Sequence, residues 1–345
     1  MKLVFRTDGS ATIGLGHVMR CLALAQVAQE SGHSSVFIMA PGGEKIAERL
    51  RAEQCMVLPL VSKMGSKEDA VETTRLAREQ AANWIIADGY QFDTGYQQTV
   101  RKENIPLLFI DDYGHAGQYD ADIILNQNFY ADEMKYRNAA EHGQQLLGPM
   151  YALLRREFVL WQVRKRTIAK TATRILVSMG GADTRNDTGR VLKCLESMDR
   201  GTWEITVVSG AANPHLKLLE QAARESRHAM TLLANVSNMA ALMAEADVGI
   251  TAGGSTCYEL LYMGLPGIVL ITADNQERNV LALGRTDAVV NAGWNTKTDD
   301  RSLIALLDSV IGDQTLRSRL SAKGMGIVDG RGCSRVLSAM QRPHA

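Results

Sequence analysis

The sequence has 345 residues, a length that suits two medium-sized domains better than one. Hydrophobic residues make up 46% and charged residues 22% of the chain, which excludes a mainly disordered protein. Lys and Arg together number 38, as do Asp and Glu, so the formal net charge is zero and we expect neither a nucleic-acid partner nor a membrane partner.

Cysteine and histidine usage argues against disulfides and metals. The 5 cysteines are scattered without a CxxC pair, so we expect a reducing, cytoplasmic location. The 7 histidines include no HExxH motif and no pair at ligand spacing, so we expect no metal site. The first apolar run ends at Arg6 and no apolar stretch reaches about 18 residues, so we expect neither a signal peptide nor a membrane span.

The first half of the chain alternates short apolar runs with amphipathic segments. The apolar runs predict buried strands of a parallel sheet at residues 2–7, 35–40, 84–87, 107–110 and 123–125. Apolar residues at helical spacing predict helices at residues 17–30, 67–82 and 153–163. We expect Ser66 to cap the start of the second helix and Gly32 to follow the end of the first.

A second series follows the basic segment 164–172, which we interpret as a solvated linker. Strands are predicted at residues 174–177, 203–208, 230–233, 247–251 and 267–271. Helices are predicted at residues 187–198, 216–226, 239–246 and 275–283, with a further helix opening at Ser255.

Each series opens with a strand that leads into a glycine turn. This pattern predicts an α/β fold of two Rossmann-like, doubly wound parallel-sheet domains facing each other across an interdomain cleft. We expect the domains to span residues 1–163 and 173–312. The helical tail at 313–345 is able either to cover the flank of one domain or to cross back to the other.

The loop that runs from Asp8 to His17 contains Gly14 and Gly16, which let the backbone approach a ligand closely. It follows the first strand, where a doubly wound sheet places its ligand crevice. Position 19 is Met rather than the third glycine of a dinucleotide fingerprint, and no P-loop GK[ST] follows. The loop therefore does not predict NAD or ATP, and we expect no cofactor.

His17 is the strongest catalytic candidate. It falls in the first turn of a helix, where the dipole disfavours imidazolium and so suits a general base; a hydrogen bond to a nearby loop is the alternative. Asp8 is placed either to orient His17 or to cap the loop. Tyr90 follows another strand and is a candidate to hydrogen-bond a phosphate or a sugar. Asp111 and Asp112 resemble a metal-binding pair, but successive strand residues point to opposite faces, so we expect no metal there.

A second candidate site lies in the other half, where a predicted strand ends and a helix opens. Gly254, Ser255 and Thr256 offer free amides and hydroxyls to a diphosphate at this helix start. Glu259, one turn further on, is placed either to accept hydrogen bonds from a ribose diol or to add a favourable charge to the first turn. Other candidates for ligand contact at the same edge are Gly180, Gly181 and Gln276.

Two facing domains, with a glycine loop and a base in the first and a diphosphate helix in the second, describe the GT-B architecture. The opening RTDGSATIGLGHVMRCLALA resembles the UDP-2,4-diacetamido-2,4,6-trideoxy-β-L-altropyranose hydrolases of pseudaminic acid biosynthesis. Further segments that fit this family are 88–90, 112–113, 121–126, 151–158, 179–181 and Glu259. The resemblance covers roughly residues 1–290.

The resemblance implies an enzyme that binds a UDP-activated diacetamido-trideoxy sugar in the cleft without a metal. His17 matches the family's general base, which activates water to attack the anomeric carbon with inversion and C–O cleavage. Tyr90 matches an active-site tyrosine, and Glu259 matches the residue that holds the uridine ribose. The chain departs from the family pattern at Tyr258, where a family member has an asparagine that contacts the substrate.

Other protein classes remain as alternatives. A GT-B glycosyltransferase would share the nucleotide site but need an acceptor, and the balanced charge of residues 42–51 gives little support to a lipid acceptor. A hydrolysing UDP-sugar 2-epimerase would release UDP only after elimination across C1–C2. A catalytically silent nucleotide-sugar binder is disfavoured because Asp8, His17 and Tyr90 are expected at one rim. We therefore expect a small-molecule UDP-sugar as the partner and a monomer as the state.

Overall fold

A computed structural model describes residues 1–10, 14–139, 143–161, 166–181, 183–210, 213–234 and 236–341 of the protein. Contacts within the chain divide it into two compact units. Unit 1 comprises Met1–Arg156 and the segment from Gly330 onward, and unit 2 comprises Glu157–Asp329. Over these described ranges, no helix combines the length and the apolar character that a bilayer crossing demands.

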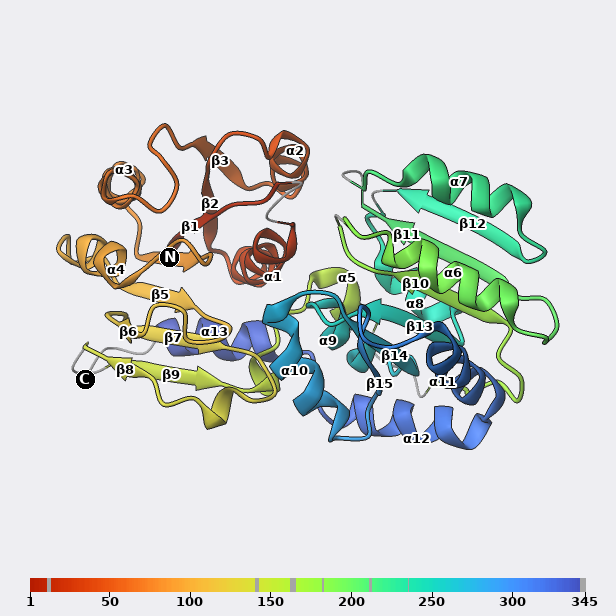
Figure 1. Ribbon diagram of the computed structural model, residues 1–345. Coiled ribbons are helices and arrows are strands. Elements are labelled where there is room, and N and C mark those ends of the chain that lie inside the picture. Colours follow the sequence, from red (N-terminus) through yellow and green to blue (C-terminus); the bar gives the residue numbers. More distant parts are fainter. Residues whose placement is uncertain are drawn as a thin grey trace. The chain divides into compact units, whose positions relative to one another are not determined.

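Unit 1 is built on a parallel sheet (Figure 1). Its strands are β1 (Lys2–Thr7), β2 (Ser34–Met39), β3 (Met56–Pro59), β4 (Trp84–Asp88), β5 (Leu107–Ile110), β7 (Ile123–Asn126) and β9 (Gln144–Leu147). They lie in the order β3-β2-β1-β4-β5-β7-β9, so the chain runs outward from β1 and returns to start again at β4. The short strands β6 (Gln118–Tyr119) and β8 (Arg137–Asn138) pair separately with each other.

Helices cover both faces of this sheet because its inner strands are apolar on both faces. They are α1 (Gly16–Glu30), α2 (Glu44–Ala52), α3 (Lys67–Glu79), α4 (Thr94–Arg101) and α13 (Gly332–Gln341), with 3-10 turns at Ala131–Glu133 and Pro149–Tyr151. In β1, Leu3 and Phe5 pack in the core with α1 and α13, whereas Val4 packs in the core with α3 and α4. The alternation of strand side chains thus produces a doubly wound unit.

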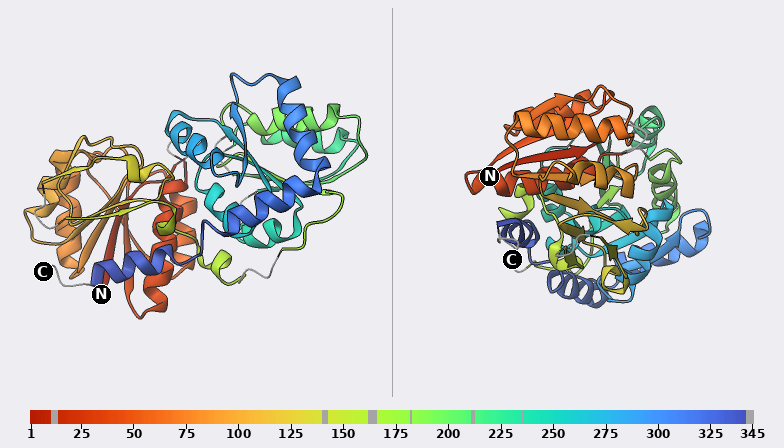
Figure 2. Two further views of the ribbon diagram at one scale, coloured as in Figure 1. Left: turned by 90° about the horizontal axis from the view of Figure 1, so that it is seen from below. Right: turned by 90° about the vertical axis from the view of Figure 1, so that its left-hand side faces the viewer.

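Two of the predicted capping residues lie at helix ends in the structure. The Ser66 hydroxyl accepts a hydrogen bond from the amide of Asp69, which fixes the start of α3. Gly32 follows α1 with φ of +77°, a conformation that favours glycine. The last helix, α13, lies alongside α1 (Figure 2), and the indole Nε1 of Trp84 donates to the carbonyl of Met340 at 3.1 Å.

Unit 2 repeats the same plan. Its strands are β10 (Arg174–Ser178), β11 (Glu204–Ser209), β12 (Ala229–Ala234), β13 (Val248–Ala252), β14 (Gly267–Ile271) and β15 (Val290–Trp294). They form a parallel sheet in the order β12-β11-β10-β13-β14-β15. Its helices are α6 (Asp187–Ser197), α7 (Leu216–Glu225), α8 (Met239–Glu245), α9 (Thr256–Tyr262), α10 (Asp274–Gly284), α11 (Asp300–Gly312) and α12 (Gln314–Met325).

The boundaries of the units differ from the expected ones. The helix predicted at 153–163 is reduced to α5 (Arg156–Val159), because the amides of Leu153 and Arg156 donate to the side-chain oxygens of Gln127 and Gln26 instead of continuing a helix from 153. Part of the predicted linker, residues 164 and 165, lies outside the described residues. The helical tail takes both of the routes left open, since α12 remains in unit 2 and α13 packs in unit 1.

A buried arginine ties the C-terminal end of α11 to the segment that precedes β10. Arg317 in α12 is fully buried, and its Nη1 donates to the carbonyl of Val310 at 2.9 Å. Its Nη2 donates to the carbonyls of Ala169 at 2.8 Å and Lys170 at 3.2 Å. These carbonyls lie at a helix end or in irregular backbone, so the guanidinium supplies hydrogen bonds that they would otherwise lack.

We expect Arg317→Met to lower the free energy of unfolding of unit 2 by about 1–3 kcal/mol, because buried carbonyls lose their donor. Urea unfolding of the full chain measures this change. The matched control is Arg319→Met on the same helix, where the side chain is exposed and the change should stay within about 0.5 kcal/mol. Equal effects of the two substitutions would contradict a role for the Arg317 hydrogen bonds.

Candidate functional site

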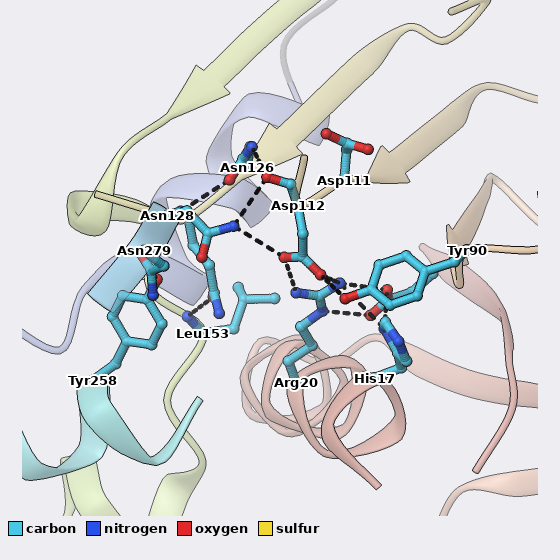
Figure 3. Close-up of polar contacts among 12 residues, drawn as sticks. His17, Arg20, Tyr90, Asp111, Asp112, Asn126, Asn128, Leu153, Tyr258 and Asn279 are labelled. Atoms are coloured by element: carbon cyan, nitrogen blue, oxygen red, sulfur yellow. Dashed lines mark hydrogen bonds and ion pairs between the residues drawn. The ribbon is translucent and has the colours of Figure 1, made fainter. Parts of the chain in front are cut away.

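The candidate site in unit 1 lies where the strand order changes direction, between β1 and β4. Doubly wound sheets bind ligands at such a point, outside the carboxyl ends of the strands. His17 lies in the first turn of α1, directly after the β1 loop. Asp88 ends β4 opposite Thr7 of β1, and Asp112 follows β5. The fold therefore brings three titratable side chains from separate segments to one edge of the sheet. Figure 3 shows two of them, His17 and Asp112, on either side of Arg20 and Tyr90.

His17 forms a dyad with Asp88. Its Nδ1 lies 2.7 Å from the carboxylate Oδ1 of Asp88, which is fully buried at the end of β4. A carboxylate only accepts, so Nδ1 carries a proton and donates it, and in the neutral imidazole Nε2 is then the nitrogen with the free lone pair. The arrangement holds the imidazole in the tautomer that a general base needs.

Arg20 lies one helical turn after His17 and joins two carboxylates. Its Nε donates to Oδ2 of Asp88 at 2.6 Å and its Nη2 donates to Oδ1 at 2.6 Å, which makes a bidentate pair. Its Nη1 donates to Oδ1 of Asp112 at 2.7 Å. Asp112 also accepts from the side-chain amide of Asn128 at 3.2 Å. The buried guanidinium therefore fixes both carboxylates in place.

Burial and charge act in opposite directions on these groups. Burial alone raises the pKa of Asp88, but attraction to Arg20 and hydrogen bonds from Arg20 and His17 outweigh it, so this pKa lies well below its usual range. The pKa of Asp112 is also lowered, because Arg20 again outweighs burial. Burial lowers the pKa of Arg20, yet Asp112 and Asp88 together raise it well above its usual value. Both carboxylates are therefore ionised at neutral pH.

The lowered pKa of Asp88 makes stability depend on acid. Because the folded-state pKa lies below the unfolded value of about 3.9, the contribution of Asp88 is fully present above the unfolded value. It is lost progressively as the pH falls below the unfolded value and on through the folded-state pKa. Between about pH 5 and about pH 3, we expect the free energy of unfolding to fall more steeply in the parent protein than in Asp88→Asn. Urea titrations across this range measure the two slopes, and identical slopes would contradict the prediction.

Tyr90 lies between His17 and the second carboxylate. Its hydroxyl donates to Oδ2 of Asp112 at 2.7 Å, and its ring meets the His17 ring edge-on with centroids 4.8 Å apart. The ring of Tyr113, which is 41% exposed, lies 5.1 Å from that of Tyr90. The structure thus brings the predicted residues His17 and Tyr90 together, with an aromatic surface beside them.

Asp8 does not orient His17. It is buried, and its carboxylate accepts from Arg6 at 2.7 Å, from the backbone amide of Ala40 at 2.7 Å and from the side-chain amide of Gln91 at 3.0 Å. These partners engage both carboxylate oxygens, so Asp8 holds the end of β1 to its neighbours. The predicted orienting role belongs by geometry to Asp88, which ends the adjacent strand.

Asp111 and Asp112 point into different networks, as their positions on successive residues predict. Asp111 accepts from the hydroxyls of Tyr119 at 2.8 Å and Tyr136 at 2.6 Å, and it lies 2.8 Å from Nδ1 of His115. Among the described residues, no group of His, Cys, Asp and Glu side chains has a metal-binding arrangement. Asp111 therefore fastens the segment after β5, and the two carboxylates belong to separate hydrogen-bond networks.

Gly14 and Gly16 frame the start of α1. A side chain added at either position would meet no atom of the described residues within 4 Å. Gly14 has φ of +83°, which favours glycine. Residues 11–13 of the same loop lie outside the described residues. These two glycines remain predictions for ligand contact.

In unit 2 the strand order changes direction between β10 and β13, and the second candidate site lies there. The backbone amides of Gly254, Ser255 and Thr256 donate to no other residue in the described part of the chain. Ser255 precedes α9 without a side-chain capping bond, and Gly254 faces open space. Three consecutive free amides beside a helix start suit an anionic ligand.

The neighbouring helix start in unit 2 is already filled. The carboxylate of Asp183 accepts from the amide of Asp187 at 2.6 Å and from the amide of Thr188 at 3.1 Å, and the N-cap residue Asn186 accepts from the amide of Gly189. Gly180 has φ of +92° and no atom of the described residues near its side-chain position, whereas the carbonyl of Gly181 packs tightly against Gly210. An anion is therefore favoured at α9 rather than at α6.

Gln276 and Glu259 lie near the free amides. The side-chain oxygen of Gln276 accepts from the amides of Gly253 at 3.2 Å and Thr272 at 2.9 Å, which ties the ends of β13 and β14 together. Glu259 is buried in α9, as is Tyr258, whose hydroxyl lies 3.4 Å from the side-chain oxygen of Asn279. Gln276 thus has a structural contact, and its ligand role remains a prediction.

The sequence did not predict that the partners of His17 and Tyr90 are Asp88, Arg20 and Asp112. Its spacing from His17 could have identified Arg20, because positions three apart on a helix share a face. A buried arginine beside a histidine also needs anionic partners. Asp88 and Asp112 each follow an apolar strand, as Asp8 does. Asp8 was the expected partner of His17 because it is nearer in the sequence. The strand order instead places Asp88 beside His17.

Comparison with known proteins supports the fold. Residues 171–324 match the glycosyltransferase family 28 C-terminal domain. The chain is 27% identical over 281 residues to the uncharacterized protein MJ1062 of Methanocaldococcus jannaschii, covering 78% of this chain but only about half (55%) of that relative. It is also 27% identical over 287 residues to the UDP-2,4-diacetamido-2,4,6-trideoxy-beta-L-altropyranose hydrolase of Campylobacter jejuni, covering 83% and 97% of the two chains.

Among solved structures, the chain is similar to MurG of Acinetobacter baumannii, with a TM-score of 0.67, 15% identity and 99% coverage of both chains. At this identity the similarity concerns the fold alone. The predicted GT-B fold, with two Rossmann-like parallel-sheet domains, is confirmed.

Proposed function

We propose that the protein is a metal-independent hydrolase that removes UDP from UDP-2,4-diacetamido-2,4,6-trideoxy-β-L-altropyranose, in pseudaminic acid biosynthesis. The observation that carries the proposal is the His17–Asp88 dyad, with Nδ1 committed to an ionised carboxylate. The Campylobacter relative bears the name of this hydrolase, and the family 28 match covers most of unit 2.

In the proposed reaction, Nε2 of His17 accepts a proton from a water molecule as its oxygen attacks the anomeric carbon. The bond between that carbon and the UDP oxygen breaks on the opposite side, and its electron pair leaves with UDP, so the configuration inverts. Asp88 stabilises the imidazolium that forms, because the opposite charge lies 2.7 Å from Nδ1. No second carboxylate of the glycosidase kind is required, since UDP is already a good leaving group.

The second requirement is stabilisation of the leaving diphosphate. The free amides of Gly254, Ser255 and Thr256 are suited to neutralise its developing charge. Glu259 is proposed to bind the ribose diol. The proposal therefore assigns the leaving diphosphate to these amides and the proton transfer to His17.

A glycosyltransferase is the second candidate, favoured by the family 28 match. NMR of the purified full-length protein with the UDP-linked diacetamido sugar in D₂O, without an acceptor, tests both. The hydrolase predicts UDP release, an inverted first sugar product and retention of the hydrogen at C2. Absence of UDP release without an acceptor favours a transferase, and deuterium at C2 indicates a 2-epimerase that eliminates first.

A further inference from the structure

The guanidinium of Arg20 lies against the imidazole of His17 as well as against two carboxylates. Its Nη2 lies 3.2 Å from Nδ1 of His17. A guanidinium only donates, and Nδ1 already donates to Asp88, so no hydrogen bond joins these two nitrogens. Both nitrogens instead donate to the same acceptor, Oδ1 of Asp88, at 2.6 Å from Arg20 and 2.7 Å from His17. A fixed positive charge therefore lies beside the imidazole (Figure 3).

This arrangement is unfavourable for the protonated ring. Imidazolium and guanidinium carry the same charge, and a buried site strengthens their repulsion. Asp88 acts in the opposite direction, since its carboxylate attracts a proton to the ring. Arg20 weakens that attraction as well, because its Nε and Nη2 occupy both carboxylate oxygens of Asp88. Arg20 thus opposes the imidazolium in two ways, directly and through Asp88.

Other titratable groups near His17 do not supply this effect. Tyr90 contributes an edge-on ring, with centroids 4.8 Å apart. Burial raises the pKa of the Cys21 thiol well above its usual value, so the thiol stays uncharged at neutral pH. Asp112 interacts electrostatically with His17, and its negative charge favours the imidazolium. Among these described groups, Arg20 alone is cationic.

We propose that Arg20 is a positioning residue that keeps His17 available as a base, by opposing the protonated ring both directly and through Asp88. The inference rests on the proposed function, in which Nε2 of His17 accepts a proton from water. It gives Arg20 a role in the reaction beyond the stability of its buried ion pairs. Asp112 has the opposite effect on the ring, and its pair with Nη1 of Arg20 at 2.7 Å reduces that effect.

NMR titration of the imidazole in the full-length protein tests this role. Long-range ¹H–¹⁵N spectra follow both ring nitrogens with pH, and the His17 signals are those that His17→Asn removes. We expect Arg20→Met to move the midpoint of the His17 titration upward by about 1–3 pH units, the usual effect of one nearby charge. We expect Asp112→Asn, which removes a negative charge, to move this midpoint downward.

Opposite directions of shift separate an electrostatic role from a structural one. A loosened site would move the midpoint the same way in both variants, toward that of a solvated imidazole. Arg20→Lys keeps the charge but not the planar fork, so its midpoint should lie between those of the parent and Arg20→Met. The matched control is Arg75→Met on α3, where the side chain is exposed. There the His17 midpoint should stay within about 0.3 pH units, because an exposed charge is screened.

A midpoint that Arg20→Met leaves unchanged or lowers would overturn the inference. If Arg20→Met does not fold, Arg20→Lys and Asp112→Asn decide the question. Shifts of these two variants in the same direction, or no shift in either, would then overturn it.

Turnover distinguishes this inference from the proposed function. Where the UDP-sugar is hydrolysed, the acid limb of the turnover–pH profile should follow the His17 midpoint, so that a higher pH restores turnover in Arg20→Met. A protein that shows the NMR shifts but releases no UDP supports the effect of Arg20 on His17 and refutes the hydrolysis. A protein that hydrolyses the sugar nucleotide and shows no shift refutes the inference alone.

Discussion

His17→Asn should lower the turnover of the UDP-sugar by roughly 10²- to 10⁴-fold, the usual contribution of a general base. Asn retains a polar group near Asp88 but has no lone pair basic enough to accept a proton from water. UDP binding should be nearly unchanged, because the proposed diphosphate amides lie in unit 2. UDP release over time and calorimetric titration with UDP measure the two quantities separately.

The matched control is His33→Asn, just beyond the other end of α1. His33 contacts the N-terminal amine of Met1 at 2.9 Å and takes no part in the dyad. Its replacement should leave turnover within about twofold, as expected for a residue remote from the chemistry. Near-normal turnover in His17→Asn would remove His17 from the mechanism and leave the dyad as a structural pair.

Arg20→Met should destabilise unit 1 strongly, with a loss of about 3–5 kcal/mol in the free energy of unfolding. The buried guanidinium makes a bidentate pair with Asp88 and a further bond to Asp112. Without it, two buried carboxylates keep their desolvation penalty and repel each other. Urea unfolding of the full chain at neutral pH measures the loss.

Two controls define the cause. Arg75→Met removes an exposed partner of Glu79 on α3 and should cost at most about 1 kcal/mol. Arg20→Lys keeps the charge, but a single ammonium cannot make both pairs, so it should lie between parent and Arg20→Met. If Arg20→Met lowers the free energy of unfolding no more than Arg75→Met does, then other groups stabilise the carboxylates of Asp88 and Asp112.

Much of the fold follows from local patterns. The continuous apolar runs located β1, β5 and β14, and the Ser66 cap located the start of α3. Other elements carried weaker patterns. β3 (Met56–Pro59) is only partly buried, and β15 includes Gly293 with φ of +73°, so neither shows the apolar run that marks an inner strand.

The candidate site was predicted only in part because its contacts span strands that are distant in sequence. His17 and Gly254 were identifiable, since each lies at a helix start that follows a strand and a glycine-containing loop. The partner of His17 was not, because Asp8 and Asp88 follow strands of the same kind. Only the pairing of β1 with β4 puts Asp88, 71 residues away, against the imidazole.

The return of the chain to unit 1 has a consequence for synthesis on the ribosome. Helix α13 supplies Cys333, Val336, Leu337 and Met340 to the core that contains Leu22 of α1. The whole of unit 2 is translated before these side chains emerge. Unit 2 is thus able to complete its fold first, while the nascent N-terminal half keeps one flank of its core uncovered until α13 arrives.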